Sequence, residues 1–126
     1  MNFLNILIHP GNKVNFEFIY KIIDKDEWQN VKKDKKFLGT KKDLEDGFIH
    51  FSEQEQIKAT LDKYFKGISN LVLLKVRTIN LDHLLWEQAS DGNMFPHLYS
   101  PLDISDVFKE FEIKLENNNH ILPSNL

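Results

Sequence analysis

Residues 46–52 read Asp46-Gly47-Phe48-Ile49-His50-Phe51-Ser52 and lie between a lysine-rich segment and the clearest helix pattern in the chain. Side chains alternate along an extended backbone, so His50 and Ser52 are expected on one face of this segment. Ile49 and Phe51 then lie on the opposite face and are predicted to be core residues. His50 is the residue that strand packing alone does not explain, and it is the first candidate for a functional site.

The residues directly after this stretch predict a helix, because they fit the pattern of a helix N-terminus. Ser52-Glu53-Gln54-Glu55 fits a capping box, in which Ser52 accepts a hydrogen bond from an amide three residues on. Residues that can share one helix face then recur as far as the terminator Gly67: Ile57, Thr60, Leu61, Tyr64 and Phe65. A helix N-terminus also carries free amides and partial positive charge. Ser52 therefore has two interpretations, an N-cap or part of an anion-binding site.

A second stretch, Met94-Phe95-Pro96-His97-Leu98-Tyr99, repeats the character of the first, with a hydroxyl residue two positions after a histidine. Pro96 lacks an amide hydrogen, so this stretch is predicted to be an edge strand, a bulge or a loop. Tyr99 can stack on a flat ring and donate a hydrogen bond, or it can pack against a sheet. We expect the two histidine stretches to face each other across one pocket.

The remaining chain alternates strand patterns with one short helix. Residues 16–23 are apolar on both faces and predict a central strand, while residues 107–115 are typical of a strand with one solvent-exposed face. Residues 71–76 and 81–88 are also predicted strands. Few helices among mostly sequential strands predict an α+β domain with a largely antiparallel sheet.

The short helix is predicted directly after the first strand. Asp24 or Asp26 is placed to cap it, and Trp28 and Val31 share a face at a spacing of three. From residue 37 to residue 47 the chain is expected to run as a loop.

The chain of 126 residues is long enough to bury one core, so we expect a single α+β domain over residues 16–116. Residues 1–15 are expected to form an N-terminal extension, closed by the turn signal Pro10-Gly11. Residues 117–126 are rich in asparagine without periodicity, and they are expected to form a mobile tail.

Composition narrows the partners. The formal net charge is -3 and Arg77 is the one arginine, which weighs against nucleic acid as a partner. Cysteine is absent, so disulfides and thiolate chemistry are excluded. No segment approaches the roughly 20 apolar residues of a membrane span, and the first residues lack a signal-peptide pattern. We expect a soluble, cytoplasmic protein with no membrane partner.

Glu87 follows Trp86, whose bulk is expected to remove water from its surroundings. A partly buried carboxylate needs a partner, and beside a histidine it would form either a salt bridge or a catalytic pair. His50, His83, His97 and Glu87 are also metal-ligand types. They show neither H-x-H nor H-x-x-x-H spacing, so no metal site is predicted and a metal-dependent hydrolase is the least favoured function.

Several short motifs follow one another in a recognisable order: Tyr20-Lys21-Ile22, Trp28, Gly39, Asp43, Asp46 to Ser52, Gln56, Thr60, Phe65-Lys66-Gly67, Asn70 to Leu74, Trp86-Glu87, Phe95 to Tyr99 and Pro101-Leu102. This pattern resembles a family of small bacterial and plant proteins, catalogued as domain of unknown function 952. The resemblance extends over residues 18–114 and excludes both ends of the chain.

The resemblance implies a fold similar to the ADP-ribosyltransferases, with two small, mainly antiparallel sheets and two main helices around a cleft. In those enzymes the cleft holds NAD, aromatic rings enclose the nicotinamide, and a glutamate stabilises positive charge on the ribose. The counterparts implied here are Glu87 and His50 as catalytic residues, with Ser52, His97 and Tyr99 as ligand-binding residues. Lys21 is a departure, because those enzymes carry a histidine or arginine on the early strand.

Two functions are thus predicted for the same pocket. In the first, the protein acts on or binds NAD or a nucleotide that contains ADP-ribose, so NAD is a candidate substrate and no particular cofactor is predicted. In the second, the domain binds a small anionic ligand without catalysis. The family itself implies no demonstrated activity, and the pattern carries no information about oligomeric state.

Overall fold

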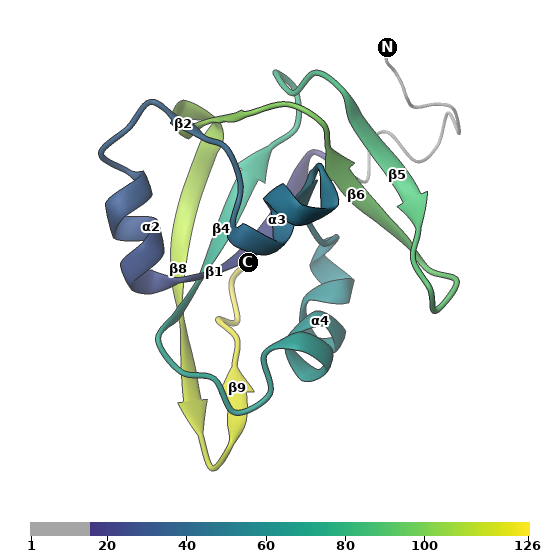
Figure 1. Cartoon of the computed structure of the whole chain (residues 1–126). Helices are drawn as coiled ribbons and strands as arrows, with labels where there is room; N and C mark the ends of the chain where they lie inside the picture. Colours follow the sequence, from purple (N-terminus) through teal and green to yellow (C-terminus); the bar gives the residue numbers. More distant parts are fainter. Residues whose placement is uncertain (1–15) are drawn as a thin grey trace.

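The computed structural model describes residues 16–126, and its largest element is a four-stranded antiparallel sheet in the order β1-β4-β8-β9 (Figure 1). Strands β1 and β4 pair along their full length, and β8 pairs with β4 across a bulge at residues 75–76. The strands predicted at residues 16–23 and 107–115 are confirmed as β1 and β8. However, β1 lies at the edge of the sheet and not at its centre. The strands are β1 (Phe18–Asp24), β4 (Leu71–Arg77), β8 (Val107–Glu116) and β9 (Asn119–Ile121).

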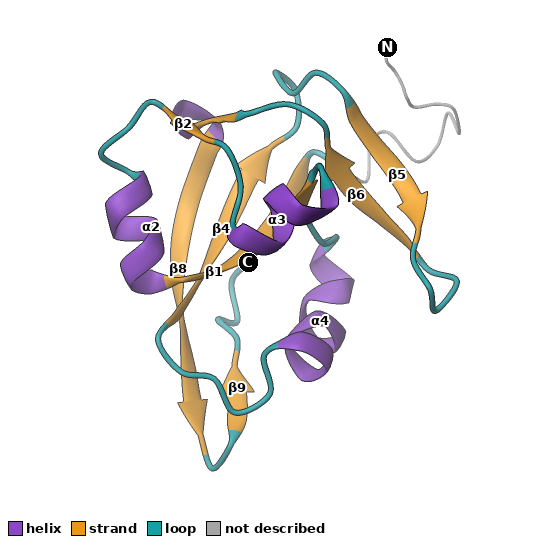
Figure 2. Ribbon diagram, in the orientation of Figure 1, coloured by secondary structure: helices purple, strands orange, loops and turns teal. Residues whose placement is uncertain are grey.

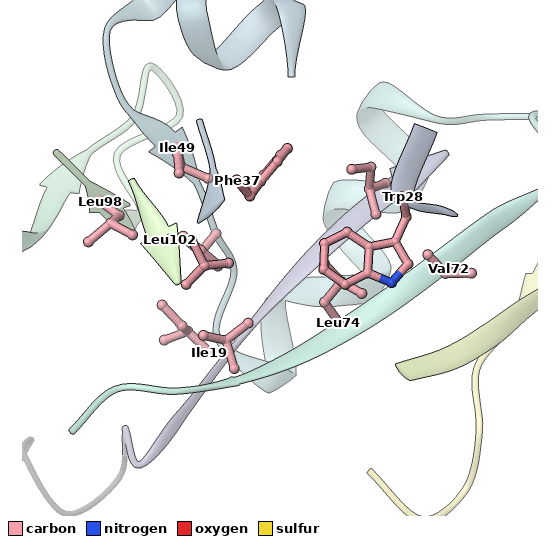
Figure 3. Packing of buried hydrophobic residues seen from close by; sticks show 11 residues of the cluster. Ile19, Trp28, Phe37, Ile49, Val72, Leu74, Leu98 and Leu102 are labelled. Carbon is pink, nitrogen blue, oxygen red and sulfur yellow. The ribbon is translucent and has the colours of Figure 1, made fainter. Parts of the chain in front are cut away.

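A core covers each face of this sheet, which explains why β1 is apolar on both sides. Ile19 and Ile23 contribute to the first core, whereas Tyr20 and Ile22 contribute to the second. Figure 3 shows the first core, whose residues come from all three sheets and from helix α2 (Lys25–Val31). Its labelled members are Ile19, Trp28, Phe37, Ile49, Val72, Leu74, Leu98 and Leu102. Helix α4 (Ile57–Tyr64) packs on the second core, on the opposite side of the sheet from α2 (Figure 2).

A smaller, three-stranded antiparallel sheet has the order β3-β6-β5, and a two-stranded sheet pairs β2 with β7. The predicted α+β class with mostly antiparallel strands is therefore confirmed. The bounds are β2 (Lys36–Phe37), β3 (Ile49–His50), β5 (Leu84–Gln88), β6 (Met94–Leu98) and β7 (Leu102–Asp103).

Strand β6 is the middle strand of its sheet, so the prediction of an edge, bulge or loop for residues 94–99 was wrong. The proline is tolerated because β3 is very short. Phe51 donates its amide to the carbonyl of Pro96 at 3.0 Å, but Pro96 has no amide to return. Pairing with β3 therefore ends at His50, and the chain continues to Ser52, which bridges Tyr20 of β1.

Two helix starts differ from the predictions. Residues 41–46 were expected to be loop, but they form α3 (Lys41–Asp46), capped by a reciprocal pair of bonds between Thr40 and Asp43. Before α4, a 3-10 turn (Gln54–Gln56) is capped by Glu53 and not by Ser52. The cap of α2 is Asp24, as predicted.

Residues 117–126 were expected to be a mobile tail, but they belong to the fold. Asn119–Ile121 pair with the end of β8, and Leu122 and Leu126 pack on the second core. Asparagines at positions 117 and 118 take positive φ angles of 50° and 66°, which lets the chain reverse tightly. The asparagine-rich composition therefore marks a hairpin turn. The expected N-terminal extension, residues 1–15, lies outside the described residues.

A second 3-10 turn (Ile104–Asp106) leads into β8. Within residues 16–126, none of the helices is long and apolar enough to cross a membrane.

Candidate functional site

The register of the smaller sheet brings the two predicted histidines together. His50 of β3 lies directly opposite His97 of β6, and their ring centroids are 5.6 Å apart. Their neighbours Ile49 and Leu98 point the other way and are buried in the first core. Because side chains alternate along a strand, both histidines lie on the outer face of this sheet. Glu87 of β5 shares that face.

Phe48 forms an aromatic wall behind the histidines. Its ring stacks on His97 with centroids 4.0 Å apart and an interplanar angle of 25°. It also lies 4.5 Å from the ring of His50 and 5.2 Å from that of Tyr99. Phe48 was not among the predicted site residues. Its position two residues before His50 on one extended segment was the available signal.

Glu87 joins the second histidine to the tyrosine. Its Oε1 atom accepts hydrogen bonds from His97 Nδ1 at 2.8 Å and from the Tyr99 hydroxyl at 2.6 Å. Burial raises the pKa of Glu87, but the bonds from Tyr99 and His97 outweigh it and leave the pKa below its ordinary value. The hydrogen bond between Tyr99 and Glu87 raises the pKa of Tyr99 to about 12. Glu87 is therefore ionised at neutral pH, with its side chain 38% exposed.

His50 lies between two carboxylates of helix α3. Its Nδ1 is 2.6 Å from Asp43 Oδ1, and its Nε2 is 2.9 Å from Asp46 Oδ2. An ionised carboxylate only accepts hydrogen bonds, so a ring nitrogen of His50 bonds to either aspartate by donating its proton. Neither aspartate was predicted as a site residue. Asp46 and His50 are four positions apart, which is too weak a signal outside one continuous helix.

Asp43 is the buried anchor of this arrangement, with 2% of its surface exposed. Its carboxylate accepts bonds from Thr40 N, from His50 N and from the ammonium of Lys21, whose nearest oxygen is at 3.0 Å. Burial raises the pKa of Asp43, but the bond from His50, the charge of Lys21 and the Thr40 amide leave it well below its ordinary value. Asp43 is therefore a carboxylate throughout the neutral range.

Lys21 of β1 stands where the ADP-ribosyltransferases carry a histidine or arginine, and here it has a structural role. It is 5% exposed, and its Nζ also donates to the carbonyl of His50 at 2.9 Å. Burial lowers the pKa of Lys21, while the charge of Asp43 opposes that effect. Lys21 thus forms a buried ion pair with Asp43 and a hydrogen bond to the backbone of His50.

Ser52 does not join this cluster. It is buried, and its Oγ lies 3.1 Å from Thr60 Oγ1 on helix α4. Its backbone exchanges two hydrogen bonds with Tyr20, each 2.8 Å long. Because Glu53 is the cap residue, the predicted helix-start anion site at Ser52 is not formed. Ser52 connects β1, β3 and α4.

The metal interpretation finds no support among residues 16–126, where no group of three or more potential ligands is arranged to hold an ion. His83 lies apart from the other two histidines, in a surface hollow of about 470 Å³. That hollow also includes Lys36, Asp82 and Asp106, and its lining excludes His50, Glu87, His97 and Tyr99.

A pH-dependent stability is expected from His97. Its pKa is lowered chiefly by burial; the bond to Glu87 opposes this shift and the charge of His50 adds to it. As the pH is lowered, His97 in the unfolded chain therefore binds a proton near pH 6.5, whereas in the native protein it binds one only at a lower pH. Stability contributed by neutral His97 is complete above that pH and is lost as the pH falls through the pKa of the folded state.

The measurement is urea unfolding at several pH values between neutral and mildly acidic. The free energy of unfolding of the wild type should decrease as the pH is lowered. In His97→Gln the free energy of unfolding should depend less steeply on pH. Ser100→Ala, a nearby change without a titratable group, is the control. An identical slope in wild type and His97→Gln would contradict this assignment.

The fold and the cluster together define a class: a small α+β protein with two carboxylate-bound histidines on the outer face of its smaller sheet. The chain belongs to the family described as "Protein of unknown function (DUF952)", whose profile matches residues 22–110. The matched region includes Asp43, His50, Glu87, His97 and Tyr99. No curated protein matches the chain.

Three solved structures are similar to this chain, and all are of protein CC0527 from Caulobacter crescentus. Its crystal structure is 43% identical, with a TM-score of 0.76, and the match covers 82% of this chain and 91% of that one. A crystal structure of a double mutant has 42% identity and the same TM-score and coverage. The solution NMR structure has 42% identity, a TM-score of 0.74, and coverage of 83% and 91%. These comparisons establish family and fold, and the three similar structures are of CC0527 and not of ADP-ribosyltransferases.

Proposed function

We propose that this protein cleaves the bond between ribose and the ring nitrogen in NAD or in a related nucleotide that contains ADP-ribose. The observation that carries this proposal is the Glu87 carboxylate. One of its oxygens is held by His97 and Tyr99 at 2.8 and 2.6 Å, while the side chain is 38% exposed. A fixed, ionised carboxylate of this kind stabilises positive charge that develops at an anomeric carbon.

Tyr99 supplies a surface for the base. It is 43% exposed and lies beside Glu87, so a flat ring can stack on it while approaching the carboxylate. The nicotinamide of NAD carries a positive charge, which adds a cation–π attraction to the stacking. Phe48 backs the Tyr99 ring and limits its movement.

The charges beside Glu87 favour the cationic nicotinamide ring over a simple anion at this point of the surface. The Lys21 ammonium is buried and pairs with Asp43, so it does not reach a ligand beside Glu87. A simple anion there therefore meets the Glu87 carboxylate, which repels it, whereas the nicotinamide ring of NAD carries a positive charge.

The decisive experiment combines binding with turnover. NAD and ADP-ribose at millimolar concentration should raise the melting temperature of the wild type, and NAD should release nicotinamide. Tyr99→Ala should reduce both effects, with Tyr64→Ala on α4 as a matched control for an exposed tyrosine. Saturable binding without nicotinamide release would instead support the non-catalytic function. The absence of both ligand binding and nicotinamide release would refute the proposal.

A further inference from the structure

The two histidines of the cluster are bonded in different ways. Both ring nitrogens of His50 lie against carboxylates, at 2.6 and 2.9 Å. His97 has one carboxylate partner, Glu87, which accepts from Nδ1 at 2.8 Å. Among residues 16–126, no hydrogen bond reaches Nε2 of His97. A neutral His97 with its proton on Nδ1 therefore has a free lone pair on Nε2.

The sheet order places the His97 ring between Glu87 and His50. Strand β6 runs between β5 and β3, and Nδ1 of His97 meets Glu87 of β5. On the β3 side, the centroid of the His50 ring lies 5.6 Å from that of the His97 ring. Phe48 stacks on the ring and keeps it in this plane.

The surrounding charges maintain this difference between the histidines. Asp43 and Asp46 of α3, with Lys21 beneath them, face His50. Glu87 of β5 and the Tyr99 hydroxyl face the other side of His97. Burial lowers the pKa of His97, and the bond to Glu87 opposes this shift without cancelling it, so the neutral ring is favoured.

We propose that His97 Nε2 takes the proton from an attacking water molecule, so that the reaction at this site is hydrolysis. This inference rests on the proposed function. The water oxygen forms a bond to the anomeric carbon and gives its proton to Nε2. The bond from that carbon to the ring nitrogen breaks, and its electron pair neutralises the pyridinium, so nicotinamide leaves without needing a proton. His97 then releases its proton to solvent.

The burial of His97 selects water as the acceptor of the ribosyl group. His97 is 9% exposed and its ring is covered by Phe48, so only a small molecule can reach Nε2. A side chain of another protein could reach Glu87 and Tyr99 at the surface but could not be deprotonated by His97. The expected product is free ADP-ribose and not a modified protein.

Nitrogen-detected NMR of the histidine side chains in the full chain tests the protonation states without any ligand. At neutral pH, His97 should show one protonated Nδ1 and one unprotonated Nε2. His97→Gln assigns its signals. A doubly protonated His97 at neutral pH, or a proton on Nε2 in place of Nδ1, would overturn the inference whatever the enzyme assay shows.

Turnover of labelled NAD tests the role of His97. His97→Gln should lower the rate of ADP-ribose formation about 100-fold and remove the loss of rate that the wild type shows on acidification. His120→Gln, on β9 of the four-stranded sheet, is the matched control. Undiminished hydrolysis in His97→Gln, or label appearing on protein, would overturn the inference and leave the proposed function standing. No turnover by the wild type would refute the proposed function and the role of water, while the NMR result would still decide the protonation states.

Discussion

Replacing Asp43 by asparagine is expected to lower the free energy of unfolding by about 3–5 kcal/mol. The substitution leaves the Lys21 ammonium buried without its counter-ion, which had been 3.0 Å away. It also weakens the reciprocal cap that begins helix α3 and removes the charge that holds His50. Urea unfolding with a tryptophan fluorescence signal measures the loss, because Trp28 is fully buried in the native core.

Two variants separate the buried ion pair from the other roles of Asp43. Asp46→Asn removes the more exposed carboxylate on His50 and should cost no more than about 1 kcal/mol. Lys21→Met combined with Asp43→Asn should be less destabilised than Asp43→Asn alone, because no unpaired charge stays buried. A loss for Asp43→Asn similar to that for Asp46→Asn would contradict the assigned importance of the pair.

The same pair predicts the direction of acid denaturation. The pKa of Asp43 is lower in the folded protein than its ordinary value of 3.8. The native state therefore binds fewer protons than the unfolded chain in this range. The stability from the Asp43 carboxylate is present above that value and is lost as the pH falls toward the pKa of the folded state.

Glu87→Gln is expected to lower the rate of NAD cleavage by about 10²–10³-fold, because it removes the negative charge at the developing cation. Glutamine retains an oxygen acceptor for Tyr99 and His97, so the melting temperature should change little. Steady-state kinetics of nicotinamide release, compared with Glu112→Gln on β8, measure the effect. Glu112 is a suitable control because it is an exposed carboxylate with one distant lysine partner at 3.8 Å.

An optical titration gives a second readout that does not depend on the substrate. Glu87 raises the pKa of Tyr99 to about 12, so Glu87→Gln should return it toward the ordinary value of 10.0. Tyr99→Phe identifies the signal among the three tyrosines. Unchanged tyrosine titration would show that the bond between Glu87 and Tyr99 is absent in solution. A changed titration with unchanged turnover would remove Glu87 from the proposed chemistry.

Much of the fold could be predicted from local sequence, because strand alternation and caps act over a few residues. Residues 71–76 and the cap at Asp24 are confirmed, and Ile49 and Phe51 are core residues as expected. Helix α3 was missed although Thr40 and Asp43 have capping-box spacing, since an aspartate took the place of the usual glutamate or glutamine. The hairpin at residues 117–118 was hidden by a composition that equally suits disorder.

The sequence by itself determined which residues of the 46–52 stretch face the core, and it singled out His50, Glu87, His97 and Tyr99 from their types and their strand positions. The tertiary structure decided that these four converge, because the pairing of β3, β6 and β5 sets which side chains lie opposite one another. It also assigned Ser52 to packing and supplied Asp43, Asp46, Lys21 and Phe48 as partners. Burial and charge pairing depend on residues far apart in the chain, so local pattern could not predict the bonding partners of the two histidines.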